Sequence, residues 1–292
     1  MYICEIDSNR IEIPSKWDDL TKNQLLTVVR LFYNGLGEIH LKTQAVLSFL
    51  KIQMAKIDST HRAPDELYLM KHKKGKPFYA SPEQILFLAR SLDFLTVEEL
   101  DHDIGVSMAL SSSLTTNLIP SFKIGFNKYY GVSDRLFTMT FDEYLEAEVH
   151  YKAYMTNSNL DSLNKLIGSI YRPKAKNNKE TSTNYNGDPR EAFNSNLVDL
   201  YAKKFKKLNP EIKIAILLFY QGCRKFLHLN FKHVFEQSSS GSTSKGYGSL
   251  SLIDALTGDD VTKNKKVRTS MLFEVLVRLE KAAIKYEQSK QN

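Results

Sequence analysis

The spacing of hydrophobic residues predicts that helices dominate this 292-residue chain. Leu25, Val28 and Phe32 recur at intervals of three and four, the spacing that places side chains on one helix face. Ser or Thr stands three residues before Gln or Glu at 21–24, 81–84 and 140–143, the signature of a capping box at a helix start. Helical spacing predicts helices over 21–35, 41–52, 82–95, 140–155, 188–208, 210–235 and 271–287.

The sequence predicts two small β-hairpins. Residues 2–13 alternate between polar and apolar side chains on both sides of a polar turn. Residues 66–70 and 77–79 are apolar segments that flank a Lys-rich turn at 73–76, which fits a second hairpin. Residues 105–139 mix Gly, Ser and Pro with β-branched and aromatic residues, which predicts irregular structure with one strand over 118–124. The expected fold class is therefore mainly α, a multi-helix globular fold with small N-terminal and internal β-hairpins.

Two polar segments interrupt the hydrophobic pattern. Residues 174–187 and 238–249 contain too few apolar side chains to offset the entropy lost on ordering, so both are expected to be mobile. This pattern predicts an N-terminal helical domain over 1–170 and a flexible linker over 171–190. A C-terminal helical domain over 191–292 follows, with a disordered loop near 238–249.

Composition narrows the class of protein. Two cysteines cannot build a disulfide framework or a pair of zinc knuckles. The most apolar run, 212–229, contains several charged residues, which indicates a buried helix and not a membrane span. The first residues lack the basic and apolar regions of a signal peptide. We therefore expect a soluble, cytoplasmic protein without a membrane partner.

The motifs of cofactor and metal chemistry are missing from the sequence. Neither a phosphate-binding glycine loop nor a nucleophile elbow occurs, so no cofactor and no catalytic residue are predicted. Cys223, His228 and His233 follow one another at intervals of five. That spacing rotates successive side chains by about 140° around a helix, so the three diverge and no metal site is predicted.

One pair of carboxylates keeps an enzymatic alternative open. Asp142 and Glu146 lie four residues apart and share a helix face, as an acid/base pair of a hydrolase would. The helix dipole also favours acidic residues in a first turn, and Glu143 is expected to serve the capping box. The structural interpretation of these carboxylates is the preferred one.

A second alternative is nucleic-acid binding by the basic second half of a chain whose net charge is +7. Lysines alternate with Tyr201 and Phe205 near the end of one predicted helix, and a second basic stretch precedes the last helix. A solvated helix face explains these charges equally well. The candidate contacts are Lys203, Lys204, Lys206, Lys207, Lys265, Lys266 and Arg268.

The last helix has an amphipathic stripe that is a candidate partner-binding face. Leu272, Val275 and Leu279 fall on one side of it. Such a stripe either closes the protein's own core or enters a groove of a partner.

Residues 139–173 begin with Met-Thr-Phe-Asp-Glu-Tyr and end with Leu-Ile-Gly-Ser-Ile-Tyr-Arg-Pro. Together with Ile11–Pro14 and Trp17–Thr21, this segment resembles helical tail assembly chaperones encoded in bacteriophage and prophage tail gene clusters. The resemblance implies a protein that holds the tape-measure protein, or another tail protein, in the host cytoplasm during virion morphogenesis. We therefore predict a non-enzymatic, protein-binding assembly factor.

Overall fold

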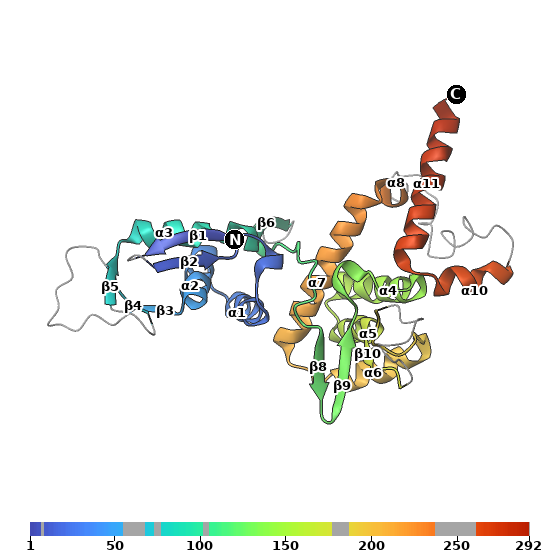
Figure 1. Ribbon diagram of the computed structural model, residues 1–292, viewed down its shortest axis with the longest axis horizontal. Helices are drawn as coiled ribbons and strands as arrows, with labels where there is room; N and C mark the ends of the chain where they lie inside the picture. The colour runs from blue at the N-terminus through green and yellow to red at the C-terminus, as the bar shows by residue number, and fades with distance from the viewer. Residues whose placement is uncertain are drawn as a thin grey trace. The chain divides into compact units, whose positions relative to one another are not determined.

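The computed structural model describes residues 1–6, 9–54, 68–72, 77–101, 105–176, 187–236 and 261–291 (Figure 1). It confirms a mainly α fold with small antiparallel sheets. Contacts divide the chain into two compact units, Met1–Leu114 and Thr115–Asn292. The division does not fall in the predicted linker 171–190, because residues on both sides of the undescribed stretch 177–186 pack inside the second unit.

The described residues of unit 1, residues 1–114, form three helices and three small sheets. Its helices are α1 (Lys22–Tyr33), α2 (Glu38–Leu50) and α3 (Pro82–Arg90), with short 3-10 turns η1 (Trp17–Asp19) and η2 (Asp93–Leu95). Its antiparallel sheets are β1 (Tyr2–Ile6) with β2 (Asn9–Ile13), β3 (Ile52–Met54) with β4 (Tyr68–His72) and β5 (Pro77–Ala80), and β6 (Thr96–Asp101) with β7 (Gly105–Leu110).

The core of unit 1 forms around Trp17, which is fully buried. Its indole Nε1 donates a hydrogen bond to the carbonyl oxygen of Phe94 at 3.0 Å, which satisfies the polar end of a buried ring. The predicted capping boxes at Thr21 and Ser81 are both present and begin α1 and α3. The two predicted hairpins are confirmed as β1–β2 and β4–β5, whereas the prediction missed β3, β6 and β7.

In the part of unit 2 (residues 115–292) that the structure describes, helices pack around one three-stranded sheet. The sheet order is β10 (Tyr171–Pro173), β9 (Asn127–Gly131), β8 (Ser121–Ile124), all antiparallel. The helices are α4 (Phe141–Asn157), α5 (Leu160–Ile170), α6 (Val198–Phe205), α7 (Pro210–Asn230), α8 (Lys232–Glu236), α10 (Val261–Thr269) and α11 (Leu272–Gln291), with 3-10 turns η3 (Asp134–Leu136) and η4 (Ser195–Leu197).

Close packing of α5 against α6 depends on a glycine. A methyl group added at Gly168 would lie 2.9 Å from the carbonyl oxygen of Val198, so only glycine allows this approach. Aromatic rings of the sheet then pack on the C-terminal end of α6, where Phe205 is fully buried. Phe205 of α6 lies 5.2 Å from Phe122 and 4.9 Å from Tyr129, measured between ring centroids.

Several sequence-based boundaries need correction in unit 2. The predicted strand over 118–124 is confirmed as β8, but its partner β9 was missed. The predicted helix over 188–208 is wrong for 188–194, because Asp188 and Arg190 are buried in extended chain that forms ion pairs. The predicted mobile loop near 238–249 lies outside the described residues. Among the helices that the structure describes, none is long and apolar enough to cross a membrane.

Candidate functional site

The β8–β9 hairpin carries the most exposed large hydrophobic residue of the described chain. Gly125 and Phe126 form its two-residue turn, and only Gly125 has a positive φ, +58°, the pattern of a type II′ turn. Phe126 at the tip is 107% exposed relative to a reference peptide. The β8–β9 hairpin projects beyond the helices of unit 2 (Figure 1), and the ring of Phe126 at its turn is fully exposed to solvent.

The two faces of this hairpin differ in chemistry. Phe122 and Tyr129 cover one face and pack on α6, which fixes the hairpin to the core. On the other face, the exposed Lys123 lies directly opposite the exposed Lys128. Directly opposed like charges destabilise a strand pair, so folding stability does not account for this arrangement. The ammonium of Lys128 also lies 4.7 Å from the ring centroid of Tyr130.

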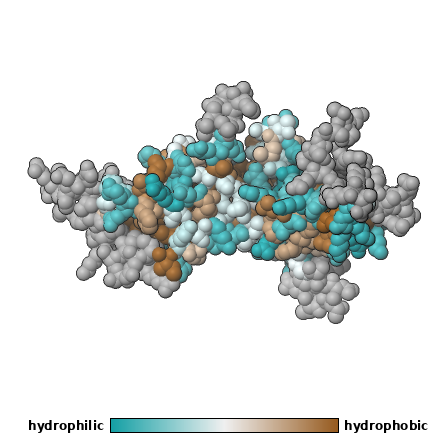
Figure 2. Space-filling model, turned by 90° about the horizontal axis from the view of Figure 1, so that it is seen from above, coloured by the Kyte–Doolittle hydropathy of each residue, from teal (hydrophilic) through white to brown (hydrophobic). Residues whose placement is uncertain are grey.

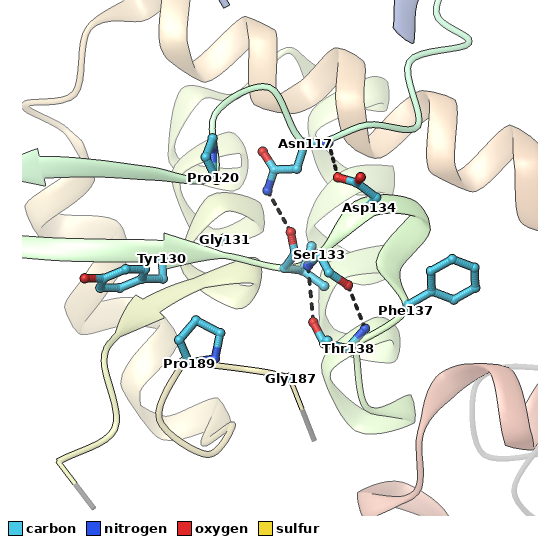
Figure 3. A pocket seen from close by; sticks show the side chains of 11 residues that line it. Asn117, Pro120, Tyr130, Gly131, Ser133, Asp134, Phe137, Thr138, Gly187 and Pro189 are labelled. Carbon is cyan, nitrogen blue, oxygen red and sulfur yellow. Dashed lines mark hydrogen bonds between the residues drawn. The ribbon is translucent and has the colours of Figure 1, made fainter. Parts of the chain in front are cut away.

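A cavity of about 360 Å³ opens at the base of this hairpin (Figure 3). Apolar surface dominates its walls, and the rings of Tyr130, Phe137, Pro120 and Pro189 border it. A cavity of this volume accommodates one or two side chains of a partner, but it lies at the small end for a metabolite site.

Asn117 holds the walls of this cavity in place. Its Nδ2 donates to the carbonyl oxygen of Val132 at 2.7 Å, and its Oδ1 accepts from the amide of Ile119 and the hydroxyl of Tyr171. Its backbone amide donates to Asp134 at 2.8 Å. These bonds join the chain before β8, the end of β9 and β10, so the cavity is preformed.

The turn on the far side of the cavity is conformationally strained. Arg135 and Leu136 have φ values of +53° and +63°, in the left-handed region that residues other than glycine avoid. The backbone amide of Arg135 donates to the carbonyl oxygen of Thr115 at 2.8 Å, and Leu136 is fully buried, so neighbouring contacts impose the conformation. Strain of this kind costs about 1–3 kcal/mol per residue and concentrates at functional sites.

A buried ion-pair cluster, consisting of Glu143, Arg172, Asp188 and Arg190, is connected to the cavity wall through Thr138. The carboxylate of Glu143 accepts from both arginines, and Arg190 also binds Asp188 through Nε at 2.8 Å and Nη2 at 2.8 Å. Burial would lower the pKa of Arg190, but Glu143 and Asp188 raise it. Arg190 additionally donates to the carbonyl oxygens of Thr138 and Ile170, which ties the 187–190 segment to the cavity wall.

The cluster corrects the role predicted for Glu143. The hydroxyl of Thr140 accepts from the amide of Glu143, as a helix cap requires, but the Glu143 carboxylate binds arginines and leaves the reciprocal half of the box unmade. For the fully buried carboxylate of Glu143, ion pairs with two arginines are more stabilising than one hydrogen bond from the backbone amide of Thr140.

The two candidate hydrolase carboxylates on α4 pair with different side chains. Asp142 pairs with Arg268 and borders a second cavity of about 420 Å³, which cluster residues also line. Glu146 pairs with His150 one turn along α4, at 3.0 Å, and does not border that cavity. Of the two carboxylates, only Asp142 therefore borders that cavity.

The candidate nucleic-acid contacts lie on two different helices. Lys203, Lys204, Lys206 and Lys207 are all exposed at the end of α6, where Lys206 pairs with Asp161 at 3.0 Å. Lys265 and Lys266 are exposed on α10, whereas Arg268 is half-buried against Asp142. The α6 lysines therefore form the more continuous basic surface of the two.

The candidate partner-binding face of α11 is buried. Leu272, Val275 and Leu279 pack within unit 2 and are at most 6% exposed, so in this structure the stripe closes the protein's own core, the first of the two expected alternatives, and is not open to a partner. Helical spacing identifies an apolar stripe but does not distinguish a core-facing stripe from a partner-facing one.

Within the described parts of the chain, no group of three or more His, Cys, Asp or Glu side chains is arranged to hold a metal ion. His228 stacks on Phe235, with ring centroids 3.9 Å apart, and His233 pairs with Glu280 at 2.7 Å. The Sγ of Cys223 lies 3.8 Å from the carbonyl oxygen of Thr115.

Sequence reasoning missed the hairpin face and its cavity. The one available signal was the Ile-Gly-Phe-Asn sequence at 124–127, since glycine at the first turn position favours a two-residue hairpin. No family model, curated protein or solved structure matches this chain. The geometry of the two units is therefore the basis for assigning a function.

Proposed function

We propose that this protein is a non-enzymatic, protein-binding assembly factor that uses Phe126 and the adjoining hairpin face as its anchor. The observation that carries the proposal is the complete exposure of Phe126 on an ordered hairpin. Hydrophobic residues also reach a largely hydrophilic surface elsewhere (Figure 2), but scattered exposure of that kind is common. A phenyl ring held at the tip of a braced hairpin is a more specific feature.

The physical case for an anchor rests on area and rigidity. Burying a phenylalanine side chain in a partner's pocket contributes about 1.5–3 kcal/mol. The hairpin is already fixed by Phe122 and Tyr129 on α6, so little conformational entropy remains to be lost on binding. Aromatic anchors of this kind dominate the energetics of many protein interfaces.

The preformed cavity supports the same assignment. It lies on the same sheet face as Lys123 and Lys128, with Tyr130 between them and the cavity mouth. A partner segment that covers this face would bury Phe126 at one end and fill the cavity at the other. Together the tip, the lysine pair and the cavity form one continuous candidate interface.

The resemblance to phage tail assembly chaperones gives the proposal its specific form. In that form the partner is a tape-measure or other tail protein, and the complex forms in the host cytoplasm before the virion is complete. Resemblance of residues 139–173 is the support for this step. The segment contains α4, α5 and β10, which provide Glu143 and Arg172 of the cluster behind the interface.

Co-purification from cells that express the natural gene neighbourhood tests the proposal. Phe126→Ser should remove a specifically retained protein, because the anchor is lost while the hairpin core remains intact. Leu160→Ser is the matched control, since Leu160 is 62% exposed on the same unit but lies at the start of α5. Retention that is equal in the wild type and both variants contradicts the assignment of Phe126 as the anchor.

Nucleic-acid binding remains the second candidate because all four lysines at the end of α6 are exposed. Filter binding of duplex DNA at several salt concentrations separates this candidate from protein binding. The logarithm of the affinity falls linearly with the logarithm of the salt concentration, and each phosphate contact adds about −0.9 to the slope. Binding that is lost when Lys203, Lys204, Lys206 and Lys207 are all changed to Gln supports the candidate, whereas no binding at low salt ends it.

A further inference from the structure

We propose a second docking surface on unit 1: the open edge of β6 accepts an extended segment of a partner protein that carries Lys or Arg side chains, by addition of a third strand to the β6–β7 sheet. This surface lies on unit 1, whereas Phe126 belongs to unit 2, and it rests on different observations. Three features support it, namely the backbone groups of β6, an adjoining cavity and the local balance of charge.

The hydrogen-bond register shows which backbone groups of β6 point away from β7. The amide of Ser111 donates to the carbonyl oxygen of Leu95 at 3.0 Å, directly beyond the first paired position, Thr96 with Leu110. Hydrogen-bonded and non-hydrogen-bonded positions alternate in an antiparallel pair. Thr96 and Glu98 therefore direct their N–H and C=O groups outward, and no other described strand pairs with that edge.

A cavity of about 420 Å³ adjoins this edge. Thr96, Val97 and Glu98 of β6 border it, together with residues of α2, α3 and η2. Ile39 and Val97, each 43% exposed, supply apolar surface next to the outward-facing backbone groups. An added strand could thus form backbone hydrogen bonds with β6 while its side chains enter the cavity.

The charges around the cavity favour a basic guest. Among the residues that border it, the ammonium of Lys42 contacts the carboxylates of Glu38 and Asp93, each at 2.6 Å. One buried ammonium therefore faces two carboxylates, and both carboxylates remain about half exposed on their outer side. Glu98 at the rim adds a third carboxylate, against the single further cation Arg90 among the residues that border the cavity.

These features together specify the occupant. The aliphatic stem of an Arg or Lys side chain fits against Ile39 and Val97, and its charged head meets the outer oxygens of Glu38 and Asp93. An acidic segment would meet an excess of like charge at the same place. The open edge requires an extended backbone, because a helix has no free N–H and C=O groups to offer along its length.

Fluorescence anisotropy with the full-length protein tests this proposal. The probe is a labelled peptide of alternating Val and Arg residues, and the comparison peptide has Glu in place of Arg. We expect the Arg peptide to bind at least about tenfold more tightly than the Glu peptide, because the cavity carries excess negative charge. Equal affinity for the two peptides overturns the proposal.

Two substitutions at one position separate the backbone contribution from the charge. Glu98→Pro removes the outward N–H without removing a β6–β7 hydrogen bond, so binding of the Arg peptide should weaken at least about tenfold. Glu98→Gln keeps that N–H, and its effect should be about threefold or less because the rim charge is solvated. Equal binding by wild type and a folded Glu98→Pro variant overturns strand addition. The single tryptophan, Trp17, reports whether unit 1 is folded in each variant.

A third variant covers the case in which Glu98→Pro does not fold. Val97→Lys changes an exposed side chain and places a positive charge beside the cavity. It should therefore lower the affinity for the Arg peptide and raise the affinity for the Glu peptide. No change in either affinity overturns the placement of the added strand beside this cavity.

Sedimentation of the wild type tests whether a second copy of this chain binds the β6 edge. A dimer that becomes monomeric in Glu98→Pro shows that a second copy, and not a different partner, covers β6. Phe126→Ser should leave peptide affinity unchanged, so failure here is distinguishable from failure of the hairpin proposal.

Discussion

The small sheets of the two units differ in how their faces and edges are covered. In unit 2 aromatic rings from α6 cover one face of the three-stranded sheet. Arg172 of β10 belongs to the buried ion-pair cluster. In unit 1 the described β6–β7 sheet has two strands. Lys42 of α2 is the one buried lysine among the side chains of unit 1 that the structure describes, and the two carboxylates that bind it remain about half exposed. Unit 2 therefore fixes a projecting side chain rigidly, whereas unit 1 leaves backbone groups open at a strand edge.

This difference shows how one fold class produces two kinds of contact surface. A braced hairpin can offer a side chain such as Phe126 with little entropic cost, so its recognition depends on the pocket of the partner. An open edge recognises a partner mainly through its backbone, with selectivity supplied by the adjoining charges. The following substitutions test whether the two units differ in rigidity as described.

Glu143→Gln should have the largest effect. It removes the charge that binds both Arg172 and Arg190 in a buried site, and such losses cost about 3–5 kcal/mol in free energy of unfolding. Urea unfolding followed by hydrogen exchange in α4 and α5 measures the loss in unit 2, while Trp17 fluorescence should show unit 1 unchanged. The matched control is Glu146→Gln, which breaks a partly exposed pair with His150 and should cost less than about 1 kcal/mol. Equal losses in the two variants would contradict a structural role for the cluster.

Gly131→Ala should lower the free energy of unfolding by a smaller amount, about 1–3 kcal/mol, because the added methyl group overpacks the junction of β9 and β10. The added methyl group would lie 2.6 Å from both Asn117 Nδ2 and the Tyr171 ring. Gly37→Ala serves as the control, since nothing lies within 4 Å of its new methyl group. Thermal unfolding monitored by circular dichroism measures both variants, and a neutral Gly131→Ala would show that the Asn117 region is loosely packed.

Lys42→Met should destabilise unit 1 by only about 1 kcal/mol, well below the effect of Glu143→Gln. Glu38 and Asp93 stay partly hydrated when the ammonium is removed, whereas the arginines of the cluster do not. The midpoint of Trp17 fluorescence in urea reports this change directly. A loss as large as that of Glu143→Gln would remove the contrast between the two units.

Acidic pH should weaken unit 2 slightly through His228. Burial, together with the charges of Arg224 and Lys152, lowers the pKa of His228 to about 4, and no described residue bonds its Nε2. Between about pH 6.5 and 4 the unfolded chain binds a proton that the folded chain does not, so stability falls as pH falls through this window. His228→Phe should lessen that decline, which urea unfolding at pH 7 and pH 5 measures. An identical pH dependence in the two proteins would contradict the lowered pKa.

Sequence patterns predicted helices better than sites, for a physical reason. Helical periodicity and capping residues such as Thr21 and Ser81 are local, and the structure reproduces them. Pairing between distant segments is not local, so the ion pair of Glu143 with Arg190 and the strand β6 were missed. The apolar stripe through Leu272 was predicted, but whether it faces the core depends on packing that no single segment encodes. Phe126 was missed because one exposed aromatic residue leaves no periodic pattern.

Photo-cross-linking in cells is the most direct test of the central claim, which is that the β8–β9 hairpin binds a protein. A photoreactive phenylalanine analogue at position 126 changes little in a fully exposed ring, and the same analogue at position 160 is the control on the same unit. The account predicts one defined protein adduct from position 126 and none from position 160. Adducts at equal yield from both positions, or adducts from position 126 to nucleic acid or lipid alone, would contradict it.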